Sequence, residues 1–138
     1  MKVRTLSLIL GLALPFAACA NPETAPTVPD TIQEVFNGSL DLQGEAAFEF
    51  NLANAGAVTA TLASVVLARP GPTTTAALEI GLGTPTEGVC NTVVAVTTPA
   101  GLTSQLTSTL DANLHCVRVR DVGNLTAPVQ FSVRVLHP

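Results

Sequence analysis

The sequence has little aromatic surface and few positive charges. Trp and Tyr are absent, and Phe is the only aromatic amino acid among the 138 residues. This removes the side chains that usually stack on nucleobases or sugar rings. Beyond Lys2 and Arg4, near the N-terminus, the chain keeps four Arg against ten acidic residues. Phosphate backbones would repel such a chain, so we exclude a nucleic-acid partner.

Motifs that mark enzyme active sites and metal sites are also missing. No Gly-x-Ser-x-Gly elbow accompanies the many Ser and Thr residues,. No Cys-x-x-Cys pair or cluster of His suggests a metal centre,. The densest acidic group is Asp41, Glu45 and Glu49, for which we prefer solvated charges to a calcium site,. We therefore predict no catalytic residues, no metal and no cofactor.

The first residues have the features of an export signal. Lys2 and Arg4 precede an apolar run over residues 6–16, which is too short to span a bilayer permanently,. The run ends in Phe16-Ala17-Ala18-Cys19, which resembles the lipobox of bacterial lipoproteins, where the Cys becomes the lipidated first residue. We predict a signal peptide over residues 1–18 and lipidation of Cys19. Ordinary secretion, with cleavage after Ala20, is the alternative.

The other two cysteines, Cys90 and Cys116, favour an exported protein. An oxidising compartment would pair them in a disulfide, and lipidation of Cys19 would leave no thiol over,. Two buried free thiols are the alternative. We expect a protein of the cell envelope, anchored in the outer membrane by lipid, or else a secreted or periplasmic one.

A proline-rich segment follows Cys19. Residues 21–30 read NPETAPTVPD, with three prolines, two acids and no apolar period. Such segments favour extended polyproline II conformations. We predict a tether over residues 19–31 that holds a domain of residues 32–138 away from its anchor.

From residue 32 onward, apolar and polar residues alternate with a period of two. Phe131, Val133 and Val135, for example, alternate with Ser132 and Arg134,. Turn signals separate such segments, and no amphipathic helix follows the leader. The sequence predicts an all-β fold, an antiparallel, jelly-roll-like β-sandwich of about eight strands. The predicted strands cover residues 32–40, 46–53, 57–67, 75–82, 89–97, 102–108, 113–121 and 129–136.

Three segments resemble the bacterial pre-peptidase C-terminal domain. They are the F-x-G-x-L, F-x-F-x-L and V-T-A-T-L series over residues 36–62, C-V-R-V-x-D-x-G-N over 116–124, and F-S-V-R-V-x-H-P at the end. The resemblance covers nearly all of the chain beyond the tether. It implies a β-sandwich that serves as a non-catalytic appendage of exported enzymes. The sequence departs from the family at Leu114 and His115, where aromatic residues are usual.

Three arginines form a candidate binding patch. Arg118, Arg120 and Arg134 fall on the outward parity of the last two strands, and neighbouring strands would bring them onto one surface,. Such a patch could dock a carboxylate or phosphate. The preferred alternative is cross-strand pairing with Glu49, Glu79 or Asp121.

The two histidines and two glycosylation-like sequences receive structural interpretations. His115 shares the parity of Val117 and Val119, so we expect it to point inward. His137, next to the C-terminal Pro138, is expected in a solvated tail. The sequons Asn37-Gly38-Ser39 and Asn124-Leu125-Thr126 are interpreted as turns,.

These features indicate a binding module rather than an enzyme. We expect a non-catalytic envelope domain that interacts with an exported protein or an envelope polymer. A structural domain that pairs an edge strand with another exported chain is the first alternative. An accessory domain of a secreted hydrolase system is the second.

Overall fold

The computed structural model describes residues 30–68 and 72–138. The predicted leader 1–18, the candidate lipid site Cys19 and most of the tether 19–31 lie outside these residues. The described segments contain no helix with the length and apolarity of a membrane span. The strands are β1 (Ile32–Leu40), β2 (Glu45–Asn51), β3 (Gly56–Leu67), β4 (Leu78–Thr86), β5 (Val89–Thr98), β6 (Leu106–Leu110), β7 (Leu114–Arg120) and β8 (Val129–His137).

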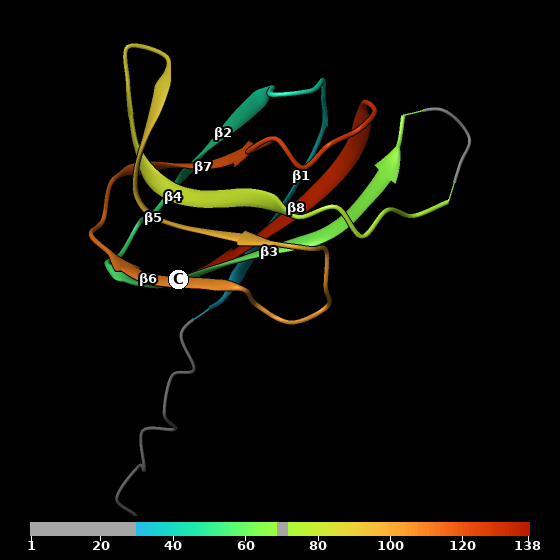
Figure 1. Ribbon diagram of the computed structural model, residues 1–138. Helices are drawn as coiled ribbons and strands as arrows, with labels where there is room; N and C mark the ends of the chain where they lie inside the picture. Colours follow the sequence, from blue (N-terminus) through green and yellow to red (C-terminus); the bar gives the residue numbers. More distant parts are fainter. Residues whose placement is uncertain (1–29, 69–71) are drawn as a thin grey trace, which may run out of the picture.

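The strands pair in a nested series, from the first with the last down to β4 with the next strand, β5 (Figure 1). β1 pairs with β8, β2 with β7, β3 with β6 and β4 with β5, all antiparallel. The pairs β3–β8 and β4–β7 complete two four-stranded sheets, β1-β8-β3-β6 and β2-β7-β4-β5. Such nesting is the jelly-roll arrangement. The predicted all-β, antiparallel, jelly-roll-like sandwich is therefore confirmed.

One face of each sheet packs against the other to form the core. Leu78, Ile80 and Leu82 of β4 are 0% exposed, as are Val117 and Val119 of β7. Alternate side chains of a strand point to the same face, so each strand delivers a row of apolar groups inward. Full burial of one such side chain stabilises the fold by about 1.5–3 kcal/mol. The alternation in the sequence thus reports the core directly.

β4 extends further than its prediction of residues 75–82. Gly83 and Pro85, which usually interrupt strands, lie inside it,. The strand continues to a two-residue turn in which Glu87 and Gly88 both have positive φ, 53° and 79°. That geometry belongs to a type I′ hairpin, whose twist matches that of the flanking strands. The hairpin therefore carries β4 and β5 beyond the end of the sandwich, as the upper arm in Figure 1.

β6 begins later than its prediction of residues 102–108 because a glutamine side chain replaces part of the strand. Gln105 accepts a hydrogen bond from the Leu62 N–H through Oε1 at 2.7 Å. Its own N–H donates to the Ala60 carbonyl at 3.1 Å, and Gly101 N–H donates to the Leu62 carbonyl at 2.9 Å. The loop over residues 99–105 is thereby fixed along the edge of β3.

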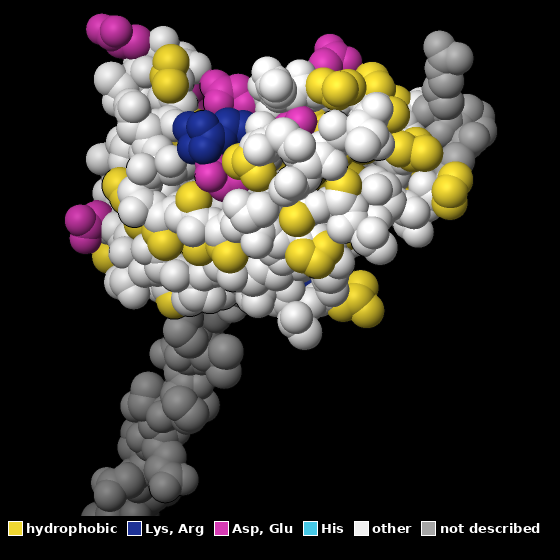
Figure 2. All heavy atoms as spheres, in the orientation of Figure 1, with side chains coloured by type: hydrophobic (Ala, Val, Ile, Leu, Met, Phe, Trp, Pro, Cys, Tyr) yellow, Lys and Arg dark blue, Asp and Glu magenta, His cyan; other side chains and the backbone are white. Residues whose placement is uncertain are grey.

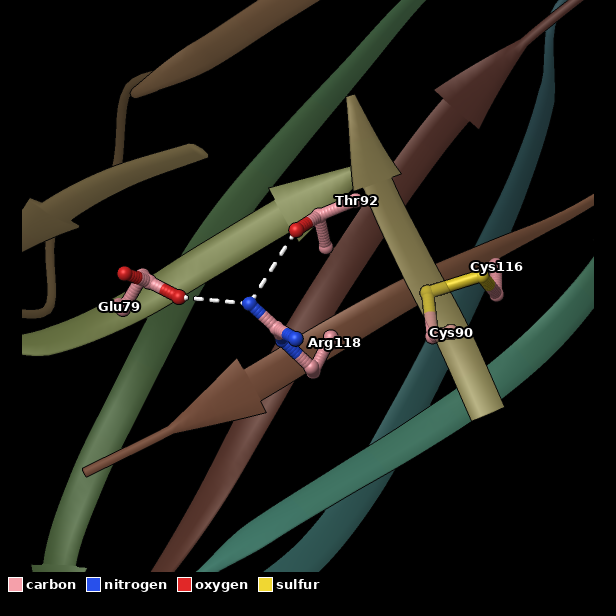
Figure 3. Close-up of a disulfide and its surroundings, with 5 residues drawn as sticks. All are labelled: Glu79, Cys90, Thr92, Cys116 and Arg118. Atoms are coloured by element: carbon pink, nitrogen blue, oxygen red, sulfur yellow. Dashed lines mark hydrogen bonds and ion pairs between the residues drawn. A yellow bond between two sulfur atoms is a disulfide. The ribbon is translucent and has the colours of Figure 1, made fainter. Parts of the chain in front are cut away.

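The predicted disulfide between Cys90 and Cys116 is present, and it joins strands that are not neighbours. Their Cα atoms lie 5.8 Å apart, although β4 separates β5 from β7 in the sheet. Two strand spacings amount to about 10 Å, so β5 must cross the outer face of β4. Gly83 permits this, because a Cβ there would collide with the Asn91 carbonyl oxygen. The register shift after Leu82 marks where β5 turns across (Figure 3).

Both ends of the described domain lie together. Ile32 at the start of β1 pairs with His137 at the end of β8. Asp30, Ile32 and Pro138 also line one open groove of about 800 Å³, with the turn between β2 and β3. The first described residues therefore lie beside Pro138.

We expect replacement of both Cys90 and Cys116 by Ala to lower the free energy of unfolding by about 3–4 kcal/mol. The bond closes a loop between residues 26 apart and so restricts the unfolded chain,. Urea denaturation of the double variant measures the effect. Wild-type protein reduced with dithiothreitol should unfold at the same urea concentration as the variant. A loss below about 1 kcal/mol would contradict the role given to this bond.

Candidate functional site

Two arginines and a glutamate form a cluster on the outer face of the β2-β7-β4-β5 sheet, and Figure 3 draws Glu79 and Arg118 of this cluster. Glu79 of β4 lies directly opposite Arg120 of β7, while Gly81 lies opposite Arg118. Arg118 Nη2 donates to Glu79 Oε1 and Arg120 Nη2 donates to Oε2, both at 2.9 Å. Arg118 also donates to Thr92 Oγ1 of β5 at 3.1 Å. The cluster thus connects three adjacent strands.

Glu79 bridges both arginines of this cluster, which keeps one formal positive charge in excess. Burial alone would raise the pKa of Glu79, but hydrogen bonds and positive charge from Arg120 and Arg118 lower it below its ordinary value,. The side chains of Glu79 and Arg118 are each only 16% exposed. An incoming anion would have to displace a carboxylate that already holds both guanidinium groups. Of the alternatives weighed from the sequence, the geometry favours cross-strand pairing.

Arg134 lies on the other side of the molecule. β8 belongs to the β1-β8-β3-β6 sheet, whose outer face points away from that of β7. Arg134 Nη2 donates to the Leu102 carbonyl oxygen at 3.1 Å. The expectation that Arg118, Arg120 and Arg134 share one surface is therefore wrong. The chain passes from one sheet to the other between β7 and β8. Outward side chains of these two strands therefore point to opposite sides of the molecule.

Acidic residues surround the two arginines of β7. Glu45 and Glu49 of β2 lie in register with Arg120 and Cys116 on the same outer face. Figure 2 shows dark-blue side chains bordered by magenta ones in this region. With Asp41 they were the candidate calcium group, and all three are exposed. Among the described residues, no three His, Cys, Asp or Glu side chains gather as a metal site.

Asp121, just after β7, is buried and organises two loops. Its Oδ1 accepts hydrogen bonds from the N–H groups of Gly123, Asn124 and Leu125. Its Oδ2 accepts one from Gln43, in the turn between β1 and β2, at 2.8 Å. Burial alone would raise the pKa of Asp121, but these four amides lower it below its ordinary value,. The carboxylate is therefore a structural anion.

The two histidines lie inside the sandwich on either side of Phe50. The inward prediction for His115 is confirmed, and its Nε2 lies 2.8 Å from the Asp111 carbonyl oxygen. The expectation of a solvated His137 is wrong, because this side chain is 2% exposed and its Nε2 lies 2.9 Å from Glu34 Oε1. The ring centroid of Phe50 lies 6.1 Å from that of His115 and 5.5 Å from that of His137. β8 includes His137, so its alternation continues to the end of the chain.

A shallow groove of about 500 Å³ crosses the outer face of the β1-β8-β3-β6 sheet. Asn37 of β1, Ser132 of β8 and Ser64 of β3 form a row across it, because they occupy matching register positions. A β-bulge between Leu62 and Ser64 bends β3 beside this row,. The groove residues are Asn37, Gly38, Ser39, Ser64, Val66, Gln130, Phe131 and Ser132.

The groove escaped the sequence analysis because its members come from three separate strands. Asn37, Gly38 and Ser39 were interpreted as a turn, and this is wrong, since they lie within β1. Gly38 is needed there because a Cβ would lie 2.7 Å from Phe131 in the core. The other sequon, interpreted as a turn at Asn124, lies outside the strands, in the connection between β7 and β8.

Comparison with known proteins supports the fold alone. No protein-family model matches the chain, and no curated protein matches it. A solved structure, the Yersinia pseudotuberculosis-derived mitogen, superposes with a TM-score of 0.51 and 10% sequence identity. The match covers 77% of this chain and 86% of the mitogen chain. At this identity the similarity concerns the arrangement of strands.

We expect Asp121→Asn to lower the free energy of unfolding at neutral pH by about 2 kcal/mol, because the bond from Gln43 is lost and the others weaken. The folded-state pKa of Asp121 is below its unfolded value. Its contribution is therefore complete above about pH 4 and disappears as the pH falls through the folded-state pKa,. Urea denaturation between pH 7 and pH 2 should show wild type and variant converging in acid. A difference that stays constant with pH would contradict this assignment.

Proposed function

We propose that this chain is an exported β-sandwich module of the bacterial cell envelope that binds a hydroxyl-rich polymer and catalyses no reaction. The observation that carries the proposal is the polar groove over β1, β8 and β3. The anchor in this proposal is lipid on Cys19. The resemblance to the pre-peptidase C-terminal domain supports a non-catalytic role, as an accessory of exported enzymes.

The proposed compartment is supported by the disulfide. Cys116 is only 1% exposed, and its bond to Cys90 holds β5 across β4. The disulfide is therefore a buried, structural one. Structural disulfides of this kind persist in oxidising compartments. The sequence of residues 1–20, with basic residues, then an apolar run, then small residues, also supports export,.

The groove offers hydrogen bonds without charge. Asn37, Ser39, Ser64, Gln130 and Ser132 supply amide and hydroxyl groups that both donate and accept,. Hydroxyl groups along a polysaccharide would complement such a row. Because Phe131, the aromatic residue of the groove, is only 3% exposed and offers no stacking platform, we expect weak binding by single sites. An anchored array of copies would strengthen it through multivalency.

Buried titratable groups also fit a binding module better than an enzyme. Asp121 is held by four backbone amides and Glu79 by two arginines. His137 contacts Glu34, and His115 contacts the Asp111 carbonyl oxygen. Each of these groups has a structural partner that already accounts for its position.

An exported protein is the second candidate for the partner. A peptide strand could add to one of the sheet edges by main-chain hydrogen bonds. The alternative of a structural domain within a larger exported assembly uses the same edges.

We expect the processed protein to carry lipid at its N-terminus. Mass spectrometry of the N-terminal peptide should show a diacylated or triacylated Cys19, and Cys19→Ser should release the protein from the membrane fraction. A processed N-terminus at Asn21 would identify ordinary secretion and contradict the anchor. The fold and groove would remain unaffected by that result.

We expect the groove to retard the protein in affinity electrophoresis through gels that contain a soluble polysaccharide. The probes are a neutral glucan, alginate and solubilised peptidoglycan. Replacing both Asn37 and Ser132 by Ala should weaken binding about thirtyfold, since two hydrogen bonds of about 1 kcal/mol each are lost.

In the matched control, Ala replaces both Thr107 and Thr109. These residues are exposed on β6 of the same sheet, outside the groove. This variant should migrate like wild type. No retardation by any of the three probes, or equal losses in the groove and control variants, would reject the proposed site.

A further inference from the structure

One part of the sequence contains no charged residue. Residues 89–110 include no Asp, Glu, Lys or Arg, although the chain carries ten acids and six basic residues. The segment is rich in Val and Thr, which are favoured in strands,. A stretch of this kind in an acidic protein calls for a structural explanation.

The structure places this segment along one side of the sandwich. It forms β5, the loop over residues 99–105 and β6. β5 is the end strand of one sheet, and β6 is the end strand of the other. We name this side, residues 89–110, the uncharged flank. Figure 2 shows mostly white and yellow side chains where β5 and β6 run in Figure 1.

Large apolar side chains project from the uncharged flank. Val93 is 71% exposed, Leu102 is 88% exposed and Val89 is 54% exposed. Behind them, Val94 and Val96 are only partly buried against the core. A second surface laid along β5 would cover Val93 and the partly exposed Val94 and Val96 and gain their hydrophobic free energy,.

The edge of β5 also lacks the usual protection against pairing. Proteins commonly protect edge strands with charged residues, with proline or with bulges. β5 contains neither charge nor proline, and beyond the bulge at Val93 residues 94–98 pair regularly with β4 on one side. The edges on the opposite flank are different, since β1 carries Glu34 and β2 carries Glu45 and Glu49.

Charge identifies the partner. The chain has a formal net charge of −4, so two copies repel each other wherever their acidic surfaces meet,. The uncharged flank can face its own copy without that repulsion. An antiparallel pair of identical strands about a twofold axis brings the same residues together from both copies. A basic partner would instead complement the acidic flank of β1 and β2.

We propose that the uncharged flank is a self-association interface in which two copies pair their β5 edges antiparallel. Sheet β2-β7-β4-β5 then continues through the twofold axis into the second copy. This inference goes beyond the proposed function, because the polymer groove lies on the outer face of the other sheet.

The test is sedimentation velocity of the full chain with Cys19→Ser, which removes lipid as a cause of association. From micromolar to submillimolar concentration we expect a monomer–dimer equilibrium. Val93→Lys should raise the dimer dissociation constant at least about tenfold, because each copy then places an unpaired charge against an apolar, uncharged surface. Added salt should leave the wild-type equilibrium unchanged or strengthen it, since no ion pair holds the dimer.

The matched control is Leu42→Lys, which adds the same charge to a 51% exposed residue on the opposite flank. It should leave the dimer unchanged. If Val93→Lys does not fold by circular dichroism, Ala95→Lys, at an exposed residue in the middle of β5, replaces it. A monomer at every concentration, or a dimer weakened by Leu42→Lys alone, overturns the proposal. Polymer retardation by the groove should persist in Val93→Lys, so the two proposals fail separately.

Discussion

Burial of one face of each sheet against the other is the constraint on which the rest of this structure depends. Every strand must place its apolar residues inward, and nested pairing from β4–β5 out to β1–β8 satisfies this for all eight. Every connection except the β4–β5 hairpin then crosses from one sheet to the other at an end of the sandwich. There the buried carboxylate of Asp121 satisfies loop amides that no sheet could pair,. The Asp121 carboxylate thus stabilises the connections, as the apolar core stabilises the sheets.

The sequence predicts the features that depend on local pattern. Alternation of apolar and polar residues identifies the eight strands and their inward residues. Side chains alternate between the two faces of a strand, whichever strands lie beside it. The pairing of Cys90 with Cys116 follows from their number, since residues 32–138 contain no other cysteine. His115 follows from its parity with Val117. Such predictions need no knowledge of the topology.

Features that depend on the topology could not be predicted from one sequence. Arg134 has the same outward parity as Arg118, yet the two side chains lie on opposite sheets. The crossing of β5 over Gly83 depends on a bulge that leaves no mark in the alternation. The groove row of Asn37, Ser64 and Ser132 joins residues from three strands, and only the register brings them together. His137 is different, because continuing the alternation of β8 by two residues would have placed it inside.

The meeting of the first and last strands has a consequence for how such a domain can be reused. Because Ile32 pairs with His137, the two points where the chain enters and leaves lie side by side. Adjacent entry and exit points allow a unit to be inserted within a surface loop of an unrelated host protein, or circularly permuted, without opening its core. Genetic recombination could therefore move this sandwich between hosts as a self-contained cassette.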